Sequence, residues 1–181
     1  MAPSGPLITA EELIRHPEWD PCELVDGRLV PTNYHGMEGG AIATDILCAL
    51  GSHARESDLG YVRPAPTGII LSHNPDTVRV PDVMFIRKER LPQGVGDEFL
   101  PVPPDIAVEV AGFLDKLNDV MKKAESYVAA GVKLVWVIDP DSRKAYVFRP
   151  GQSISELNET QALSGENVLP GFTLALSELF V

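Results

Sequence analysis

Two acidic residues occupy positions where a folded chain rarely keeps an unpaired carboxylate. Glu109 interrupts the apolar run Ile106-Ala107-Val108-Glu109-Val110, and Asp82 follows Pro81 directly before the apolar run Val83-Met84-Phe85-Ile86. An unpaired carboxylate in a buried strand is costly or becomes protonated. Two carboxylates from inner strands can instead converge on one divalent ion, and hard oxygen ligands suit Mg²⁺ or Mn²⁺. The pattern therefore predicts a two-carboxylate metal site.

Each acid also has an ordinary structural explanation. Glu109 fits equally well an edge strand with one solvent-facing carboxylate, or a structural ion pair. Period-two alternation places Glu109 on the same face as Ala107, so a half-exposed sheet face is a second interpretation. Asp82, taken alone, is more typical of a turn or of the start of a strand.

Three further residues are candidates for the same site. Lys123 lies 14 positions after Glu109, at the boundary of the buried face of a predicted helix, where a long side chain can reach back over the sheet or remain solvated. Glu38 falls in the first turn of another predicted helix, where the helix dipole favours an acid in any case. Glu23 lies in a predicted hairpin and is the weaker candidate for a carboxylate cluster.

Three of the four histidines and both cysteines are possible site residues, but they show no pattern that points to chemistry. We interpret them as structural residues without a role at the site, because the histidines lack metal-site spacing and the cysteines stand in apolar stretches. They are His35, His53, His73, Cys22 and Cys48. Phosphate-binding glycine motifs and serine-hydrolase elbows are absent from the sequence as well.

The elements that must position these residues can be predicted from turn and capping signals. Residues 9–12, Thr-Ala-Glu-Glu, form a capping-box pattern that predicts a short helix to about His16. The Asp26-Gly27 pair within 22–30 predicts a tight hairpin. Apolar residues from 37 to about 56 recur with helical spacing and predict a long helix.

The second half of the chain alternates strand and helix patterns. Strands are expected at 68–71, 77–86, 105–110, 134–138 and 145–148. A helix is expected at 115–130, and 87–104 is expected to be a loop. A strand, a helix and another apolar strand in this order predict a crossover and a mixed sheet with both faces covered.

Composition limits the class of protein. The chain has 181 residues, of which 44% are hydrophobic and 23% charged, and this fits one domain over 1–181 in which we expect 1–8 to be flexible. The net charge of −11 argues against a binder of nucleic acid that relies on overall positive charge. The start shows no secretion signal and no stretch is apolar enough to span a membrane, so we expect a soluble protein in the cytoplasm.

The chain resembles a known family over residues 23–179. The matching stretches are 23–27, 68–71, 75–85, 104–110, 123–132 and 136–140. They resemble the Uma-type (Uma-two) family of bacterial restriction-endonuclease-like proteins, which is assigned to the PD-(D/E)xK nuclease superfamily. The resemblance implies an α/β (α+β) fold, with a restriction-endonuclease-like mixed β-sheet core flanked by helices and an N-terminal β-hairpin extension.

The resemblance also implies roles for the candidate residues. Asp82 matches the first acid of the superfamily motif, Glu109 the second acid, and Glu38 the acid that the first helix often supplies. The usual lysine position is Ala111 here, and the matching lysine is Lys123 on the following helix. The implied catalytic set is therefore Asp82, Glu109, Lys123 and Glu38, with Asp82, Glu109 and Glu38 as metal ligands.

Two stretches depart from the family pattern near this expected site. The family's common Ser-Pro-Ser-Asp after the Glu-Val strand reads Gly112-Phe113-Leu114-Asp115, and the common Glu-His-Gly reads Glu38-Gly39-Gly40, without the histidine.

The function implied is a metal-dependent endonuclease that hydrolyses DNA phosphodiester bonds with Mg²⁺ or Mn²⁺. Six basic residues are expected to meet the DNA backbone: Arg87, Lys88, Arg90, Lys116, Lys122 and Lys133. Because cutting both strands needs two active sites or two visits, a homodimer is a further expectation. The alternative is a catalytically weak or inactive nuclease-fold module that binds DNA or a protein, and RNA or a small nucleotide remains open as substrate.

Overall fold

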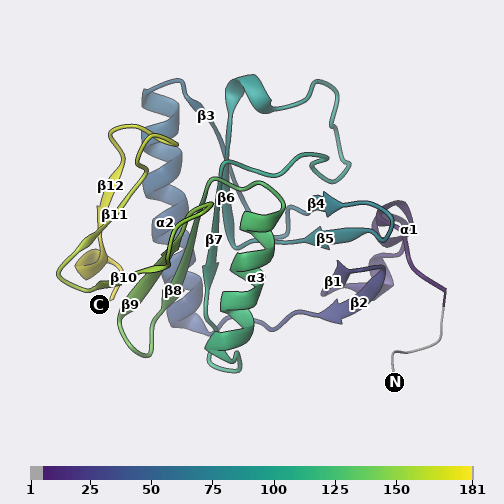
Figure 1. Cartoon of the computed structure of the whole chain (residues 1–181), viewed down its shortest axis with the longest axis horizontal. Helices are drawn as coiled ribbons and strands as arrows, with labels where there is room; N and C mark the ends of the chain where they lie inside the picture. Colours follow the sequence, from purple (N-terminus) through teal and green to yellow (C-terminus); the bar gives the residue numbers. More distant parts are fainter. Residues whose placement is uncertain (1–5, 181) are drawn as a thin grey trace.

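The computed structural model describes residues 6–180, within which the chain forms three α-helices and twelve β-strands (Figure 1). The helices are α1 (Ala10–Arg15), α2 (Met37–Glu56) and α3 (Leu117–Ala129). The strands are β1 (Cys22–Val25), β2 (Arg28–Pro31), β3 (Gly60–Pro64), β4 (Ile69–Ser72), β5 (Thr77–Arg79), β6 (Val83–Arg87), β7 (Ile106–Val110), β8 (Leu134–Asp139), β9 (Lys144–Phe148), β10 (Ser155–Asn158), β11 (Ala162–Ser164) and β12 (Thr173–Ala175). Among these residues, no helix is long and apolar enough to cross a membrane.

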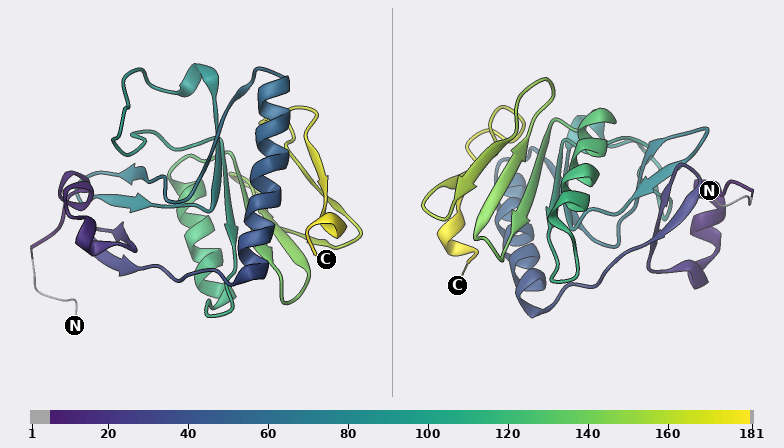
Figure 2. Two further views of the ribbon diagram at one scale, coloured as in Figure 1. Left: turned by 180° about the vertical axis from the view of Figure 1, so that it is seen from behind. Right: turned by 60° about the horizontal axis from the view of Figure 1, so that its bottom comes forward.

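A six-stranded mixed sheet forms the centre of the fold, in the order β10-β9-β8-β7-β6-β3. β7 and β8 run parallel and are joined through α3, whereas the other neighbours in this sheet are antiparallel. The helices α2 and α3 cover opposite faces of the sheet (Figures 1 and 2). The predicted mixed sheet flanked by helices is therefore confirmed.

Alternation along β7 divides the core into two halves. Ile106, Val108 and Val110 pack against α2, together with the C-terminal segment that contains β11 and β12. Ala107 faces the other way and packs with residues of α3. Glu109 shares the face of Ala107, so its carboxylate points to the side of the sheet that α3 covers.

A second, four-stranded sheet in the order β2-β1-β5-β4 lies beside α3 (Figure 1). The predicted hairpin is present as β1 and β2, and positive φ angles at Asp26 and Gly27 close the turn between them. The helix predicted to begin after Thr9 is α1, with both hydrogen bonds of the capping box formed.

The structure corrects one predicted strand and adds others. Residues 77–86 do not form one strand, because the chain leaves the small sheet after β5, turns at Pro81, and enters the central sheet as β6. β3 and the C-terminal strands β10, β11 and β12 were not predicted. Of the start expected to be flexible, residues 1–5 lie outside the described residues, and the amide of Ile8 donates to the carbonyl of Gly27 over 2.9 Å.

Candidate functional site

The break between β5 and β6 places Asp82 beside Glu109. β6 and β7 pair in a register with Val83 opposite Val108, so continuing the register by one residue brings Asp82 opposite Glu109. The amide of Val110 donates to Oδ2 of Asp82 over 2.7 Å. The amide of Asp82 donates to the carbonyl of Val108 over 3.0 Å, which fixes the backbone at the same point.

Two side chains from α3 hold the carboxylate of Glu109. The Nζ of Lys123 lies 2.9 Å from Oε2 of Glu109, and the hydroxyl of Tyr127 donates to Oε1 over 2.6 Å. Lys123 and Tyr127 are four residues apart, so they project from the same face of the helix. Glu109 and Tyr127 are buried, and the side chain of Lys123 is 17% exposed.

Glu23 joins this cluster from the small sheet. Its Oε1 lies 2.9 Å from the Nζ of Lys123 and accepts the amide of Val80 over 2.7 Å, while Arg79 donates to Oε2 over 2.8 Å. The Nζ of Lys123 also donates to the carbonyl of Val80 over 3.3 Å. An ammonium group has three donors. All three are therefore engaged, with Glu109, Glu23 and the Val80 carbonyl.

Burial and neighbouring charge shift the pKa values of these groups. Burial raises the pKa of Glu109 to about 7, because desolvation outweighs the attraction of Lys123, and Asp82 and Glu23 add to the rise. Burial alone would lower the pKa of Lys123, but Glu109 and Glu23 outweigh it and raise the pKa well above its usual range. Burial, together with Glu109, also raises the pKa of the Tyr127 hydroxyl. Lys123 therefore remains a cation at neutral pH.

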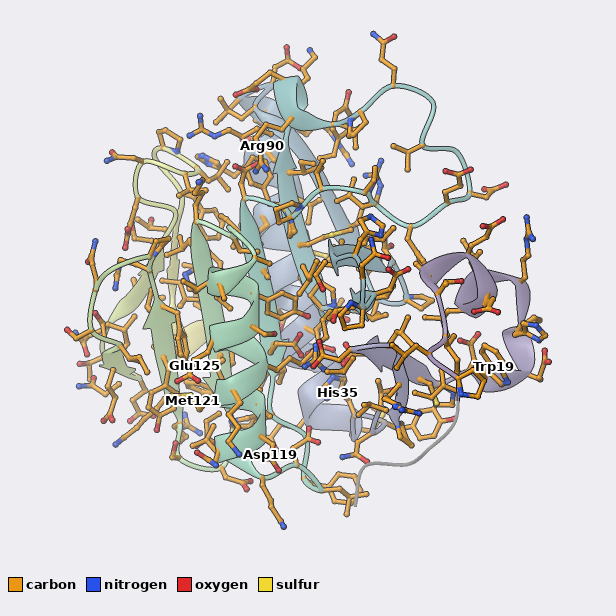
Figure 3. The ribbon with its side chains drawn as sticks, turned by 45° about the vertical axis from the view of Figure 1, so that its right-hand side comes forward. Trp19, His35, Arg90, Asp119, Met121 and Glu125 are labelled. Atoms are coloured by element: carbon orange, nitrogen blue, oxygen red, sulfur yellow. The ribbon has the colours of Figure 1, made fainter. Side chains whose placement is uncertain are left out.

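His35, interpreted from the sequence as a structural residue, is in direct contact with Asp82. Its Nε2 lies 2.7 Å from Oδ1 of Asp82, and the imidazole occupies the centre of the site between α3 and the β1-β2 hairpin (Figure 3). The hydrogen bond to Asp82 raises the pKa of His35, although burial acts in the opposite direction. Its other nitrogen, Nδ1, is buried and has no hydrogen-bond partner among the described residues. The sequence carries no signal of this contact, because 47 positions separate the two residues.

Glu38 is not brought into the cluster. Its side chain is exposed and lines a hollow of about 250 Å³ with Met37, Gly112 and Asp141. Asp82, Glu109, Glu23 and Lys123 line a separate groove of about 920 Å³. The role of Glu38 as a metal ligand stays a prediction.

Most of the expected DNA-contacting residues lie away from this groove. Lys116 and Lys122 line it. Arg90 binds Asp105, which precedes β7, and Figure 3 shows Arg90 far from His35. Three more of the six lie near the same distant end of the central strands: Arg87, Lys88 and Lys133. The predicted basic footprint is therefore reduced to two lysines beside the candidate site.

The donor set favours a hard divalent ion over a fully protein-coordinated metal. Among residues 6–180, no group of three or more His, Cys, Asp and Glu side chains is arranged to hold a metal ion. Mg²⁺ is commonly held by one or two carboxylates, with water and substrate phosphate completing its shell. Asp82 and Glu109 supply two carboxylates from residues that lie opposite each other, directly before β6 and on β7. These residues therefore fit Mg²⁺ or Mn²⁺.

Comparison with known proteins identifies the family and supports the fold. The family model of Uma2, described as "Putative restriction endonuclease", matches residues 10–177. A crystal structure from Anabaena variabilis, described as "a putative nuclease belonging to DUF820", is similar with a TM-score of 0.82 and 19% identity, covering 96% of this chain and 97% of that chain. No curated protein matches the chain. Since the family model spans nearly the whole sequence, the chain belongs to the Uma2 family.

Proposed function

We propose that this protein is a divalent-metal-dependent endonuclease that hydrolyses phosphodiester bonds in DNA. The observation that carries the proposal is the buried carboxylate of Glu109, placed opposite Asp82 and bonded to Lys123. Buried acids with perturbed pKa values in a groove are typical of functional sites. Family membership supports the same class of activity.

Asp82 and Glu109 would hold Mg²⁺ or Mn²⁺, and Glu38 remains a further proposed ligand from the adjoining hollow. A bound ion of this kind lowers the pKa of coordinated water and neutralises charge that develops on phosphoryl oxygens. His35 and the Val110 amide fix the two oxygens of Asp82. In this way the protein orients its carboxylates before substrate arrives, which is the form of preorganisation that catalysis needs.

Lys123 acts as a fixed positive charge. The carboxylates raise its pKa, so it does not serve as a general base at neutral pH. Its ammonium group offsets the negative charge of Glu109 and Glu23. This lets these two carboxylates and that of Asp82 lie together beside an anionic substrate. Glu23 and Tyr127 act through their neighbours, by positioning Lys123 and Glu109 respectively.

Cleavage of supercoiled plasmid tests the proposal, with Mg²⁺, with Mn²⁺, and with EDTA. The variants are Asp82→Asn and Lys123→Met, and Lys144→Met is the matched control, because Lys144 lies on β9, pairs with Glu156 and lines neither the groove nor the hollow. We expect metal-dependent nicking or linearisation by the wild-type protein and by Lys144→Met. Loss of at least a hundredfold in rate is expected in the two site variants. Cleavage by the purified Asp82→Asn protein at the wild-type rate would contradict these roles.

The alternative, a nuclease-fold module that binds without cutting, is favoured by one observation. Each oxygen of Asp82 and of Glu109 already has a hydrogen-bonding or ion-pair partner within the protein. Metal binding to the folded state raises the melting temperature. A melting temperature unchanged by millimolar Mg²⁺ and Mn²⁺, together with inert plasmid, would favour this alternative.

A further inference from the structure

An apolar rim borders the candidate site, and we define it as Tyr34, Met37, Phe113 and Leu114. Tyr34 and Phe113 are 75% and 73% exposed, and Met37 and Leu114 are also exposed. Tyr34 and Leu114 line the acidic groove, while Met37 and Phe113 line the adjoining hollow. Neighbouring exposed apolar side chains beside a groove are typical of a binding surface.

Two segments that are distant in sequence are held together to form this rim. Asn33 donates from Nδ2 to Oδ1 of Asp115 over 2.6 Å, across 82 positions of sequence. The ring of Phe113 lies close to Gly36, where an added Cβ would be 3.7 Å from Cδ1 of the ring. Asp115 also accepts the amide of Gly112 over 2.8 Å, which fixes the turn that carries Phe113. The segments that carry Tyr34 and Phe113 are therefore held next to each other.

The charge of the groove does not suit a substrate held mainly through phosphates. Six acidic and four basic side chains line the groove. Three of the basic ones, Arg79, Lys122 and Lys123, are already paired with carboxylates. Lys116 alone lines the groove without an ion pair in the described part of the chain. Non-specific affinity for duplex DNA comes largely from neutralised phosphates, so this groove offers little of it.

We propose that the apolar rim binds unpaired bases, so that the substrate is single-stranded or locally unpaired nucleic acid. Stacking of a base on Tyr34 or Phe113 accepts any base and adds affinity that does not come from neutralised phosphates. It needs an open face of the base, which a stacked duplex covers. The groove of about 920 Å³ is also at the upper end of small-ligand pockets, about 300–1,000 Å³. That the protein cuts this substrate rests on the proposed function. That the apolar rim binds it does not.

Equilibrium binding in EDTA and in Ca²⁺ tests the inference with the full chain. The probes are a single-stranded oligonucleotide that contains 2-aminopurine, whose fluorescence falls on stacking, and a duplex of equal length. The variants are Tyr34→Ala and Phe113→Ala. Tyr61→Ala is the matched control, because Tyr61 is an exposed tyrosine on β3, close to the distant end of β6.

We expect the wild-type protein to bind the single strand more tightly than the duplex and to quench 2-aminopurine. Each rim variant should weaken single-strand binding by about 5- to 150-fold, the effect of one lost base stack. Tyr61→Ala should bind as the wild type does. Equal affinity for both probes, or wild-type binding by both rim variants, overturns the inference. So does a homodimer that dissociates in the rim variants while DNA binding is unchanged.

These outcomes separate the two proposals. Binding of single strands through Tyr34 and Phe113 by a protein that cuts nothing supports the rim and contradicts the nuclease. Metal-dependent cleavage of plasmid, with no preference for single strands and no effect of the rim variants, supports the nuclease and contradicts the rim.

Discussion

Tyr127 donates a hydrogen bond of 2.6 Å to Oε1 of Glu109, in a fully buried position one helical turn from Lys123. Burial raises the pKa of both groups. The hydrogen bond from Tyr127 favours the ionised form of Glu109, whereas Glu109 raises the pKa of Tyr127 further, so the hydroxyl keeps its proton and remains the donor. The carboxylate thus keeps two partners from one helix, the hydroxyl and the ammonium. This pairing makes Glu109 sensitive to a change that removes a single oxygen atom.

Tyr127→Phe should lower the free energy of unfolding by about 1–3 kcal/mol, because it leaves a buried carboxylate oxygen without its donor. The loss should be larger above pH 7, where Glu109 is ionised, than at pH 5. Urea denaturation at the two pH values measures both effects. Tyr61→Phe is the control, since the hydroxyl of this exposed tyrosine has no such partner. Equal losses at both pH values would show that the bond does not depend on the charge of Glu109.

Stability should fall as the pH rises through the range in which Glu109 titrates. Its pKa is raised from 4.5 to about 7 in the folded state, so the folded protein holds the proton more tightly than the unfolded chain. The contribution to stability is therefore complete below pH 4.5 and is lost as the pH rises through about 7. The loss is on the order of 3 kcal/mol. The raised pKa of His35 acts with the same sign, and its contribution is lost as the pH rises above the usual histidine pKa of 6.5.

Glu109→Gln isolates this effect from other titrating groups. The difference in unfolding free energy between wild type and variant should decline from pH 4.5 to pH 7 and then become constant. Chemical denaturation across this range measures it. Mg²⁺ should reduce the decline in the wild type, because a cation beside Glu109 opposes protonation. A difference curve that rises with pH would mean that Lys123 outweighs burial at this site.

Much of the fold was predictable because its helices and strands carry regular patterns. The bounds of α2, Met37–Glu56, agree with the predicted helix, and the Asp26-Gly27 turn identified the β1-β2 hairpin. The break at Pro81 was missed, since apolar residues continue on both sides of it and only tertiary pairing assigns β5 and β6 to different sheets. β3 was missed because it is short, mostly exposed and ends in proline.

The site was predictable where residues violate the pattern of a buried strand. Glu109 and Asp82 are such violations, and the contact of Lys123 with Glu109 agrees with its predicted position at the helix boundary. Tyr127 and His35 do not stand out, because tyrosine fits an apolar helix face and a lone histidine has no spacing to interpret. Their contacts span 18 and 47 positions and exist only once the chain has folded.

Lys123→Met should destabilise the fold more than the double variant Lys123→Met/Glu109→Gln. Removing one partner of a buried ion pair leaves an uncompensated charge, at a cost of about 3–5 kcal/mol. Neutralising Glu109 as well removes most of that penalty, although Glu23 still loses its bond to Lys123. Denaturant unfolding of the four proteins forms a double-mutant cycle. Additive losses would indicate that Lys123 and Glu109 do not stabilise each other.

Gly39 and Gly40 offer a matched pair for testing the position of His35. Both lie inside α2, where replacing glycine by alanine should add up to about 1 kcal/mol to the free energy of unfolding. A Cβ at Gly40 meets nothing within 4 Å, so Gly40→Ala should show most of this gain. A Cβ at Gly39 would lie 3.1 Å from Nδ1 of His35, so in Gly39→Ala the imidazole that bonds Asp82 has to shift by a few tenths of an ångström.

Gly39→Ala should therefore be less stable than Gly40→Ala. Its rate of plasmid cleavage, or the rise in its melting temperature with metal, should change, while the same quantity in Gly40→Ala does not. The ring of His35 lies against the position of Gly39 and bonds Asp82. His35→Ala combined with Gly39→Ala tests the link directly. If displacement of His35 is the cause, Gly39→Ala brings no further loss once the imidazole is gone and should instead show the helical gain of Gly40→Ala. A full additional loss in the double variant would assign the effect of Gly39→Ala to the helix itself and not to the contact with Asp82.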